Sequence, residues 1–286
     1  MKKSTKIVLL LSGIIAIPNI INRVNFMIRS VPSRPSNEEQ FYKWRYGQIR
    51  YVVKGSGEPL LLIHGVYPGA DMSEWKRVSP SLFRNHRVYT IDLLGFGRSD
   101  KPNMSYSAYT FTTMINDFIR DIIGQSVIVA ASDYSAAYAI MGYCFDPTLF
   151  KKFLLIAPAG INKGFSLPTL RNLVAKWFLE LPFIGTSAYM FITNSPVGPQ
   201  LFKVLRAGDN IASNMPYNLN ATAFVGGPNT RMPIAALLCK FLNVNIKPKL
   251  NKMRLPVLIL SREHYGLPNK LMTHRLKQFL NFNNIN

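Results

Sequence analysis

The sequence is poor in cysteine and histidine, and this limits the chemistry it can support. Its two cysteines, Cys144 and Cys239, are too few and too far apart to indicate a disulfide framework. The four histidines form no cluster at ligand spacing, and there is no Cys-x-x-Cys pair. We therefore predict no structural metal and no cofactor.

Acidic residues are also scarce. The chain has 14 Asp or Glu against 34 Lys or Arg, which gives a formal net charge of +20. The basic residues are spread along the chain, and no aromatic-basic ribonucleoprotein motif or helix-turn-helix signal accompanies them, so we expect no nucleic-acid partner. Anionic lipid headgroups fit this charge, because each exposed Lys or Arg near a membrane contributes about 1 kcal/mol. A basic, solvated surface without such a partner is the alternative.

The N-terminus contains an apolar run without charged residues. Residues 7–21 are fifteen residues without a charge, preceded by three lysines and interrupted by Pro18. A full membrane span needs about 20 residues, and no small-x-small cleavage site follows. We predict an uncleaved signal anchor that makes the protein membrane-associated, with residues 22–40 as a tether; a cleaved signal peptide and a buried helix are the alternatives. Arg23 and Arg29 on the far flank leave the side of the membrane unpredicted.

Two apolar runs, each followed by a glycine-rich loop, are the most informative part of the chain. Residues 60–63 have strand length and end at His64-Gly65, where the chain must turn tightly. The second run, residues 87–91, ends in the loop Asp-Leu-Leu-Gly-Phe-Gly-Arg-Ser-Asp at 92–100. Buried strands followed by such loops indicate a parallel sheet whose working surface lies at the C-terminal edge of its strands.

The rest of the chain alternates strand and helix patterns. A hairpin is predicted at 43–54, strands at 126–131, 153–157 and 255–261, and helices at 71–83, 109–123, 135–143 and 269–280. Between about 160 and 249 only amphipathic helical patterns occur, for example at 170–181 and 233–244. The alternation predicts a doubly wound α/β domain.

These loops and their order resemble the α/β-hydrolase family. The resemblance implies a doubly wound, mostly parallel sheet with a helical cap. We divide the chain into an N-terminal anchor and linker (1–40), the first part of the core (41–160), a cap (161–249) and an incomplete last part of the core (250–286). Family members continue with one more strand, a loop with the catalytic histidine and a closing helix, so we expect this last strand and helix to be missing.

The family places its nucleophile at a strained strand-to-helix elbow after the strand at 126–131, with small residues two positions before and after it. Ser132, Asp133 and Ser135 are the candidates. Only Asp133 has small residues, Ala131 and Ser135, at both flanking positions, and Asp tolerates a left-handed backbone better than most residues. We predict Asp133 as the nucleophile and Ser135 as second choice. The alternative is that Asp133 only caps the following helix, which would stabilise it by about 1 kcal/mol.

The sequence Asp133-Tyr134-Ser135-Ala136 resembles the Asp-Trp-Gly-Gly elbow of haloalkane dehalogenases and epoxide hydrolases. The resemblance implies a carboxylate that attacks carbon and an alkyl-enzyme ester that water hydrolyses after activation by histidine. The elbow differs in lacking both glycines. The halide-binding Trp and Asn of the dehalogenases also have no match at Tyr134 and Val66.

The same resemblance implies the other parts of the site. Backbone N–H groups of Val66 and Tyr134 would form the oxyanion hole, and His64, Gly65 and Tyr67 would line the substrate pocket. Cap tyrosines Tyr189 and Tyr217 are candidates for the acid that an epoxide hydrolase needs.

The catalytic base is the part of the family's pattern that this sequence does not match. After Asp133 the only histidines are His264 and His274. His264 stands where the family carries its triad acid, so its use as a base requires a rearrangement. His274 lies in a helical pattern and is interpreted as a helix-surface residue.

Three hypotheses follow. The first is a membrane-tethered hydrolase acting on a small apolar ester, epoxide or halide. The second is a hydrolase-like binding protein for a small apolar ligand that has lost the triad histidine. The third is a truncated product that folds poorly. Without a positioned base, we expect weak hydrolase activity or none.

Overall fold

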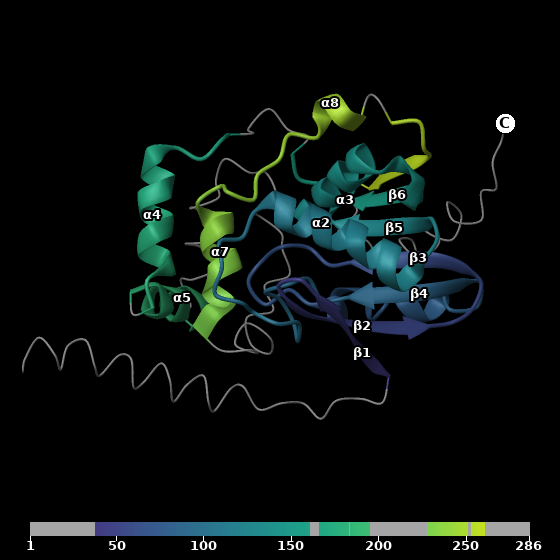
Figure 1. Cartoon of the computed structure of the whole chain (residues 1–286), viewed down its shortest axis with the longest axis horizontal. Helices are drawn as coiled ribbons and strands as arrows, with labels where there is room; N and C mark the ends of the chain where they lie inside the picture. Colours follow the sequence, from purple (N-terminus) through teal and green to yellow (C-terminus); the bar gives the residue numbers. More distant parts are fainter. Residues whose placement is uncertain (1–37, 161–165, 183, 195–227, 251–252, 261–286) are drawn as a thin grey trace, which may run out of the picture.

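The computed structural model describes residues 38–160, 166–182, 184–194, 228–250 and 253–260. Its centre is a seven-stranded sheet of order β1-β2-β4-β3-β5-β6-β7 (Figure 1). The hairpin β1 (Glu39–Trp44) and β2 (Gly47–Lys54) joins β4 (His86–Ile91) in antiparallel fashion. The remaining neighbours pair in parallel: β4 with β3 (Glu58–Ile63), β3 with β5 (Val127–Ser132), β5 with β6 (Phe150–Ile156) and β6 with β7 (Val257–Leu260). The predicted α/β fold is confirmed.

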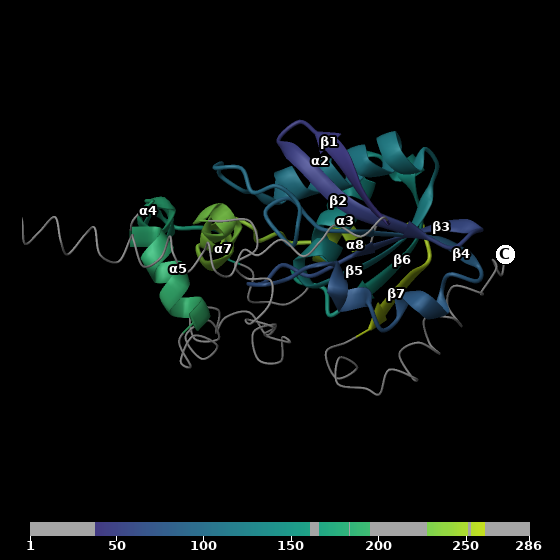
Figure 2. The same ribbon diagram turned by 90° about the horizontal axis from the view of Figure 1, so that it is seen from below.

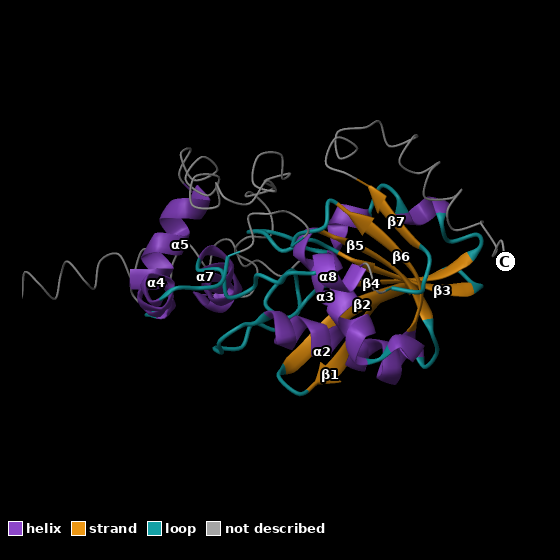
Figure 3. Ribbon diagram, turned by 90° about the horizontal axis from the view of Figure 1, so that it is seen from above, coloured by secondary structure: helices purple, strands orange, loops and turns teal. Residues whose placement is uncertain are grey.

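The central strands are apolar throughout because both of their faces are buried. In β3, Leu61 and Ile63 belong to the core on one face, and Leu60 and Leu62 to the core on the other. The first core lies under α2 (Ala108–Phe118) and α3 (Asp133–Phe145), which Figure 3 shows on one side of the strands.

The second core is covered by a segment in which sequence analysis was wrong. Residues 71–83 were predicted to be one helix, but they form two short 3₁₀ helices, η1 (Met72–Trp75) and η2 (Ser79–Ser81). Pro80 occupies the first turn of η2, where a proline interrupts a helix arriving from the N-terminal side. Trp75, Val78 and Leu82 still pack on the sheet, so the apolar spacing was correct and the helix type was not.

Other boundaries also differ from the prediction. Strand β1 begins at Glu39, four residues before the predicted hairpin, and α2 continues into a π-helical turn, η3 (Ile119–Ile123). The C-cap of that turn is Gly124, with φ of 71°, the left-handed conformation that glycine adopts without strain. The predicted helix at 269–280 lies outside the described residues.

In the described residues, the cap consists of helices set beyond one end of the sheet (Figure 2). They are α4 (Leu170–Glu180), α5 (Ile184–Asn194) and α7 (Arg231–Leu238), with a short α8 (Lys247–Leu250) near the core. Direct hydrogen bonds join cap to core: Tyr138 Oη donates to the Leu242 carbonyl at 3.2 Å, and Lys176 Nζ donates to Ser105 Oγ at 2.7 Å. None of the helices in the described residues is both long and apolar enough to cross a membrane. The predicted anchor at 7–21 lies outside these residues.

The loop after β4 contains a buried lysine whose charge makes stability depend on pH. Lys101 Nζ donates to the carbonyls of Gly97 at 2.7 Å and Ser99 at 2.9 Å. Burial lowers the pKa of this ammonium group to about 8, whereas in the unfolded chain it is about 10.4. Between these values unfolding takes up a proton, so the free energy of unfolding rises with pH.

We expect replacement of Lys101 by Met to flatten this dependence. From about pH 7.5 to about pH 9.5, the free energy of unfolding should rise by roughly 1–2 kcal/mol more in the wild type than in Lys101→Met. Urea unfolding at the two pH values measures the difference, and the comparison cancels the tyrosines and other lysines. Equal slopes in the two proteins would contradict the lowered pKa.

Candidate active site

The elbow after β5 has the geometry of a strained strand-to-helix turn. β5 ends at Ser132 and α3 begins at Asp133 without an intervening loop. Asp133 has φ of 52°, the left-handed conformation, which costs a non-glycine residue about 1–2 kcal/mol. Such strain persists only where the surrounding structure holds the residue in place. The side chain is 3% exposed and lies at the C-terminal end of the strand.

The loop after β3 meets this elbow directly. β3 and β5 are parallel neighbours with Ile63 paired to Ala131, so their C-terminal loops lie side by side. The Val66 N–H donates to Asp133 Oδ2 at 3.2 Å. This contact spans 67 positions in the sequence and ties the side chain to another strand's loop, whereas a helix cap uses its own helix. Ser132, at the N-cap position of α3, makes no side-chain capping bond.

Gly65 is required by the closeness of the two loops. A Cβ atom on Gly65 would lie 3.2 Å from Asp133 Cβ and 3.3 Å from Ser132 Oγ. These separations are tighter than ordinary van der Waals contact, and both neighbours belong to the rigid elbow. The absence of a side chain therefore lets the Val66 amide reach the carboxylate.

The second-choice nucleophile, Ser135, is used structurally. Its Oγ donates to the His64 carbonyl oxygen at 2.5 Å, and the side chain is fully buried. The bond joins α3 to the loop after β3. The third candidate, Ser132, donates its hydroxyl to Glu74 Oε1. Of the three residues, Asp133 is the one at the left-handed position of the turn.

His64 also has a structural part in the site. Its Nε2 accepts the Leu93 N–H at 3.0 Å, which fixes the tautomer, so Nδ1 carries the proton and donates to the Gly65 carbonyl at 2.6 Å. The ring is fully buried and packs edge-on against Phe96. Both nitrogens are occupied, so His64 joins two loops and is not positioned as a base.

Glu74, which the sequence did not single out, braces the loop after β3. This residue lies on η1. Its Oε2 accepts the Gly65 N–H at 2.9 Å and the Tyr67 hydroxyl at 3.0 Å, and its Oε1 accepts the Ser132 hydroxyl. One carboxylate thus holds the residue before Val66 and the residue before Asp133. Tyr67 was predicted to line the substrate pocket. It is 5% exposed, and its hydroxyl donates to Glu74.

Tyr134 follows the nucleophile position at the first turn of α3. Backbone N–H groups there have no partner within the helix, and the helix dipole favours negative charge at this end. The Tyr134 side chain turns toward the cap, where its hydroxyl donates to Asn243 Oδ1 at 2.8 Å. The role of the Tyr134 backbone as a second oxyanion donor stays a prediction.

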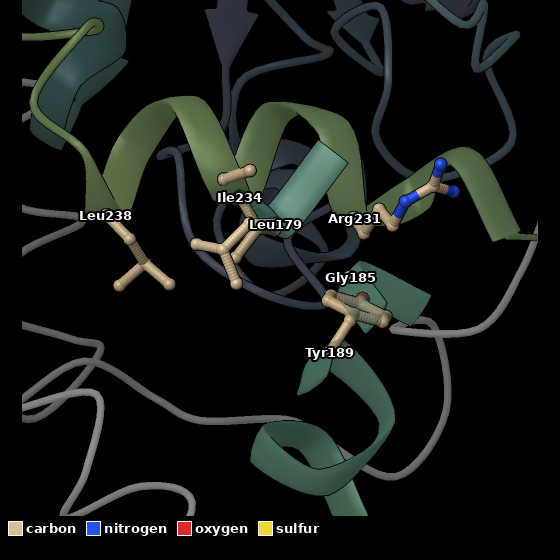
Figure 4. Close-up of a pocket in the computed structure, with 7 residues that line it drawn as sticks. Leu179, Gly185, Tyr189, Arg231, Ile234 and Leu238 are labelled. Carbon is tan, nitrogen blue, oxygen red and sulfur yellow. The ribbon is translucent and has the colours of Figure 1, made fainter. Parts of the chain in front are cut away.

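The remaining predicted residues are not brought to the elbow. Tyr189 lies on α5 and lines a small pocket within the cap, between α4, α5 and α7 (Figure 4). The candidate base His264 and the cap residue Tyr217 lie outside the described residues. No group of three or more His, Cys, Asp or Glu side chains that could hold a metal occurs in the described part of the chain.

A parallel sheet with a left-handed residue at the β5–α3 turn and a helical cap defines the α/β-hydrolase class of fold. The family model described as "Alpha/beta hydrolase family" matches residues 60–268. The chain belongs to this family, and the predicted resemblance is confirmed.

Relatives with assigned names cover part of the chain. It is 36% identical over 134 residues to 2-hydroxy-6-oxo-6-(2'-aminophenyl)hexa-2,4-dienoic acid hydrolase from Metapseudomonas resinovorans, which is 46% of each chain. It is 29% identical over 123 residues to soluble epoxide hydrolase from Corynebacterium sp., 42% of each chain. The chain spans about half the length of the curated relatives it matches. A hydrolase structure from Pseudomonas aeruginosa, 12% identical, superposes with TM-score 0.62 over 86% of this chain and 100% of that one, which supports the fold alone.

The Glu74 brace predicts a specific loss of stability. Glu74→Gln keeps the size of the side chain but replaces one acceptor oxygen by an amide group, so at least one of the three donors loses its partner. We expect the free energy of unfolding to fall by about 1–3 kcal/mol. Glu58→Gln is the matched control, because Glu58 forms a half-exposed ion pair with Lys151, a type of pair that contributes about 0–1 kcal/mol. Equal losses in the two variants, measured by urea unfolding, would show that Glu74 is not a brace.

Proposed function

We propose that this chain is a hydrolase that uses Asp133 as a nucleophile on the carbon of a small apolar halide or epoxide. The observation that carries the proposal is Asp133 at the left-handed elbow position, with one carboxylate oxygen on the Val66 N–H. An ester is the less favoured substrate, because attack by a carboxylate on an acyl carbon gives an anhydride, whereas attack on an alkyl carbon gives a stable ester. The names of the epoxide hydrolase and haloalkane dehalogenase relatives support the same class.

We assign different roles to the two carboxylate oxygens of Asp133. The Val66 N–H donates to Oδ2 at 3.2 Å, and we assign the attack on carbon to Oδ1. With an alkyl halide, Oδ1 forms a bond to carbon as the carbon–halogen bond breaks, and the halide leaves with the bonding electrons. An epoxide opens in the same way, and its ring oxygen takes a proton from an acid.

Hydrolysis of the ester uses the same contact again. Water adds to the carbonyl carbon of the Asp133 ester, and negative charge develops on Oδ2. The N–H groups of Val66 and Tyr134 stabilise that charge, as donors in an oxyanion hole do. Collapse of the tetrahedral intermediate releases the alcohol and restores the carboxylate. This step needs a base for the water, and His264 is our candidate.

The two half-reactions therefore have different requirements. Ester formation from a halide needs no base, but ester hydrolysis does. Neither histidine in the described residues serves this step, because both ring nitrogens of His64 are bonded and His86 lies at the opposite, N-terminal end of β4. This observation favours the second candidate function, a hydrolase-like protein that binds a small apolar ligand or reacts with it only once.

The N-terminal segment belongs to the proposal as well. We propose that residues 7–21 associate the protein with a membrane. The support is the uncharged run and the three lysines that precede it.

Intact-mass measurement tests the nucleophile. After incubation of the full chain with bromoalkanes of two to eight carbons and an acid quench that traps the ester, we expect at most one alkyl group per chain, located by digestion at Asp133. Asp133→Asn should not be labelled, while the matched control Asp146→Asn, at the exposed far end of α3, should be labelled like the wild type. Labelling that is unchanged in Asp133→Asn would overturn the assignment.

Bromide release separates the two candidate functions. Release of many equivalents per chain identifies a complete hydrolase, with turnover in the usual range of about 1–10³ per second. Release of one equivalent, with the ester retained, identifies a chain without a working base.

A further inference from the structure

Cap helix α4 presents its apolar side outward. Leu170, Leu173, Val174, Trp177 and Phe178 recur at the spacing of one helix face, which in a soluble protein normally packs on the core. In this structure they are 76%, 51%, 49%, 58% and 44% exposed, respectively. We call these five residues the α4 apolar face. Leu167 and Ile184, 68% and 52% exposed, extend it at either end.

The side of α4 that faces the protein carries Lys176 together with Leu179, which lines the pocket between the cap helices. The only buried residue of α4 is Lys176, which is 5% exposed. Lys176 Nζ forms an ion pair with Glu180 at 2.5 Å, donates to Ser105 Oγ at 2.7 Å and lies 5.1 Å from the centre of the Phe241 ring. These contacts hold the helix with its charged side inward, so the outward direction of the apolar face is built into the packing.

The chemistry of this surface suits a lipid bilayer. The face carries Leu, Val, Trp and Phe side chains, and the sole hydrogen-bonding group among them is the Trp177 indole N–H. Such a surface fits a fluid apolar layer with an interfacial aromatic ring. Helix α4 lies at the end of the molecule remote from the sheet (Figures 1 and 2).

The net positive charge of the cap favours a bilayer with an anionic surface. Residues 160–249 contain nine Lys or Arg and two Asp or Glu. On α4, Arg171 is exposed, and the one acid, Glu180, is paired with Lys176. An anionic surface therefore attracts the cap and meets no exposed carboxylate on this helix. We propose that the α4 apolar face inserts into the interface of an anionic membrane, independently of the N-terminal segment.

Tryptophan fluorescence tests the insertion directly. The chain has three tryptophans, and Trp44 and Trp75 are 4% and 2% exposed, so a lipid-induced change reports on Trp177. With vesicles of phosphatidylglycerol and phosphatidylcholine, we expect a blue shift of the emission and quenching by lipids brominated on the acyl chain. Pure phosphatidylcholine vesicles should give a weaker effect, and high salt should reduce binding by screening the attraction.

Sedimentation with vesicles tests the residues. The double variant Leu170→Ser/Leu173→Ser should bind anionic vesicles at least tenfold more weakly than the wild type. Tyr109→Ser, which removes a 61% exposed aromatic side chain from α2, is the matched control and should bind like the wild type. All three positions are exposed, so the variants should fold.

Three outcomes would overturn the proposal. The first is equal binding by the double variant and the control. The second is binding without a change in Trp177 emission, which would assign attachment to the N-terminal segment alone. The third is that Trp177 is already shielded from acrylamide without lipid. Shielding that depends on protein concentration would identify a second copy of the chain as the cover. Shielding that does not depend on concentration would identify another segment of this chain.

Discussion

The hydrogen bond from the Val66 N–H to Asp133 Oδ2 is the contact on which the site depends, because it joins two elements that meet only in the folded protein. It requires β3 and β5 to be parallel neighbours, a left-handed residue at the start of α3, and a glycine at position 65 to allow the approach. Each requirement is costly alone. Together they place the Asp133 carboxylate beside the Val66 amide.

The contact is supported by a series of polar groups that extends to the loop after β4. Asp92 is fully buried, and its Oδ1 accepts the Met72 N–H at 2.7 Å at the start of η1. η1 carries Glu74, which accepts the Gly65 N–H and so fixes the residue before Val66. Arg50 pairs with Asp92 at 2.9 Å and compensates its buried charge. Since an unpaired buried carboxylate is strongly destabilising, each member of the series needs the next, and the site is rigid because its polar groups are satisfied.

The features that could be predicted from the sequence were those that depend on residues close together in the chain. Both strands that flank the site were found because burial on two faces makes each of them a continuous apolar run. The elbow was found from the small residues that surround Asp133. The structural use of His64 and Ser135 was not readable, because the partner of His64, Leu93, is 29 positions away and Ser135 bonds a carbonyl 71 positions away. Glu74 escaped notice for the same reason: it lies within the segment predicted as a helix at 71–83, and its three donors come from two other loops.

The cap shows a different limit of pattern analysis. The spacing of Leu170, Leu173 and Trp177 predicts an amphipathic helix, and the helix forms as predicted. Spacing gives the width of the apolar stripe but not the direction in which it points, because direction is decided by what the opposite side can bury. Here the opposite side carries a lysine, which contacts Ser105 Oγ of the core and the Phe241 ring of the segment after α7. Turning the stripe inward would remove Lys176 from these partners and from its favourable contact with an aromatic face. The exposure of the stripe therefore follows from satisfied polar contacts on the inner side of α4, and it persists whether or not a membrane is present.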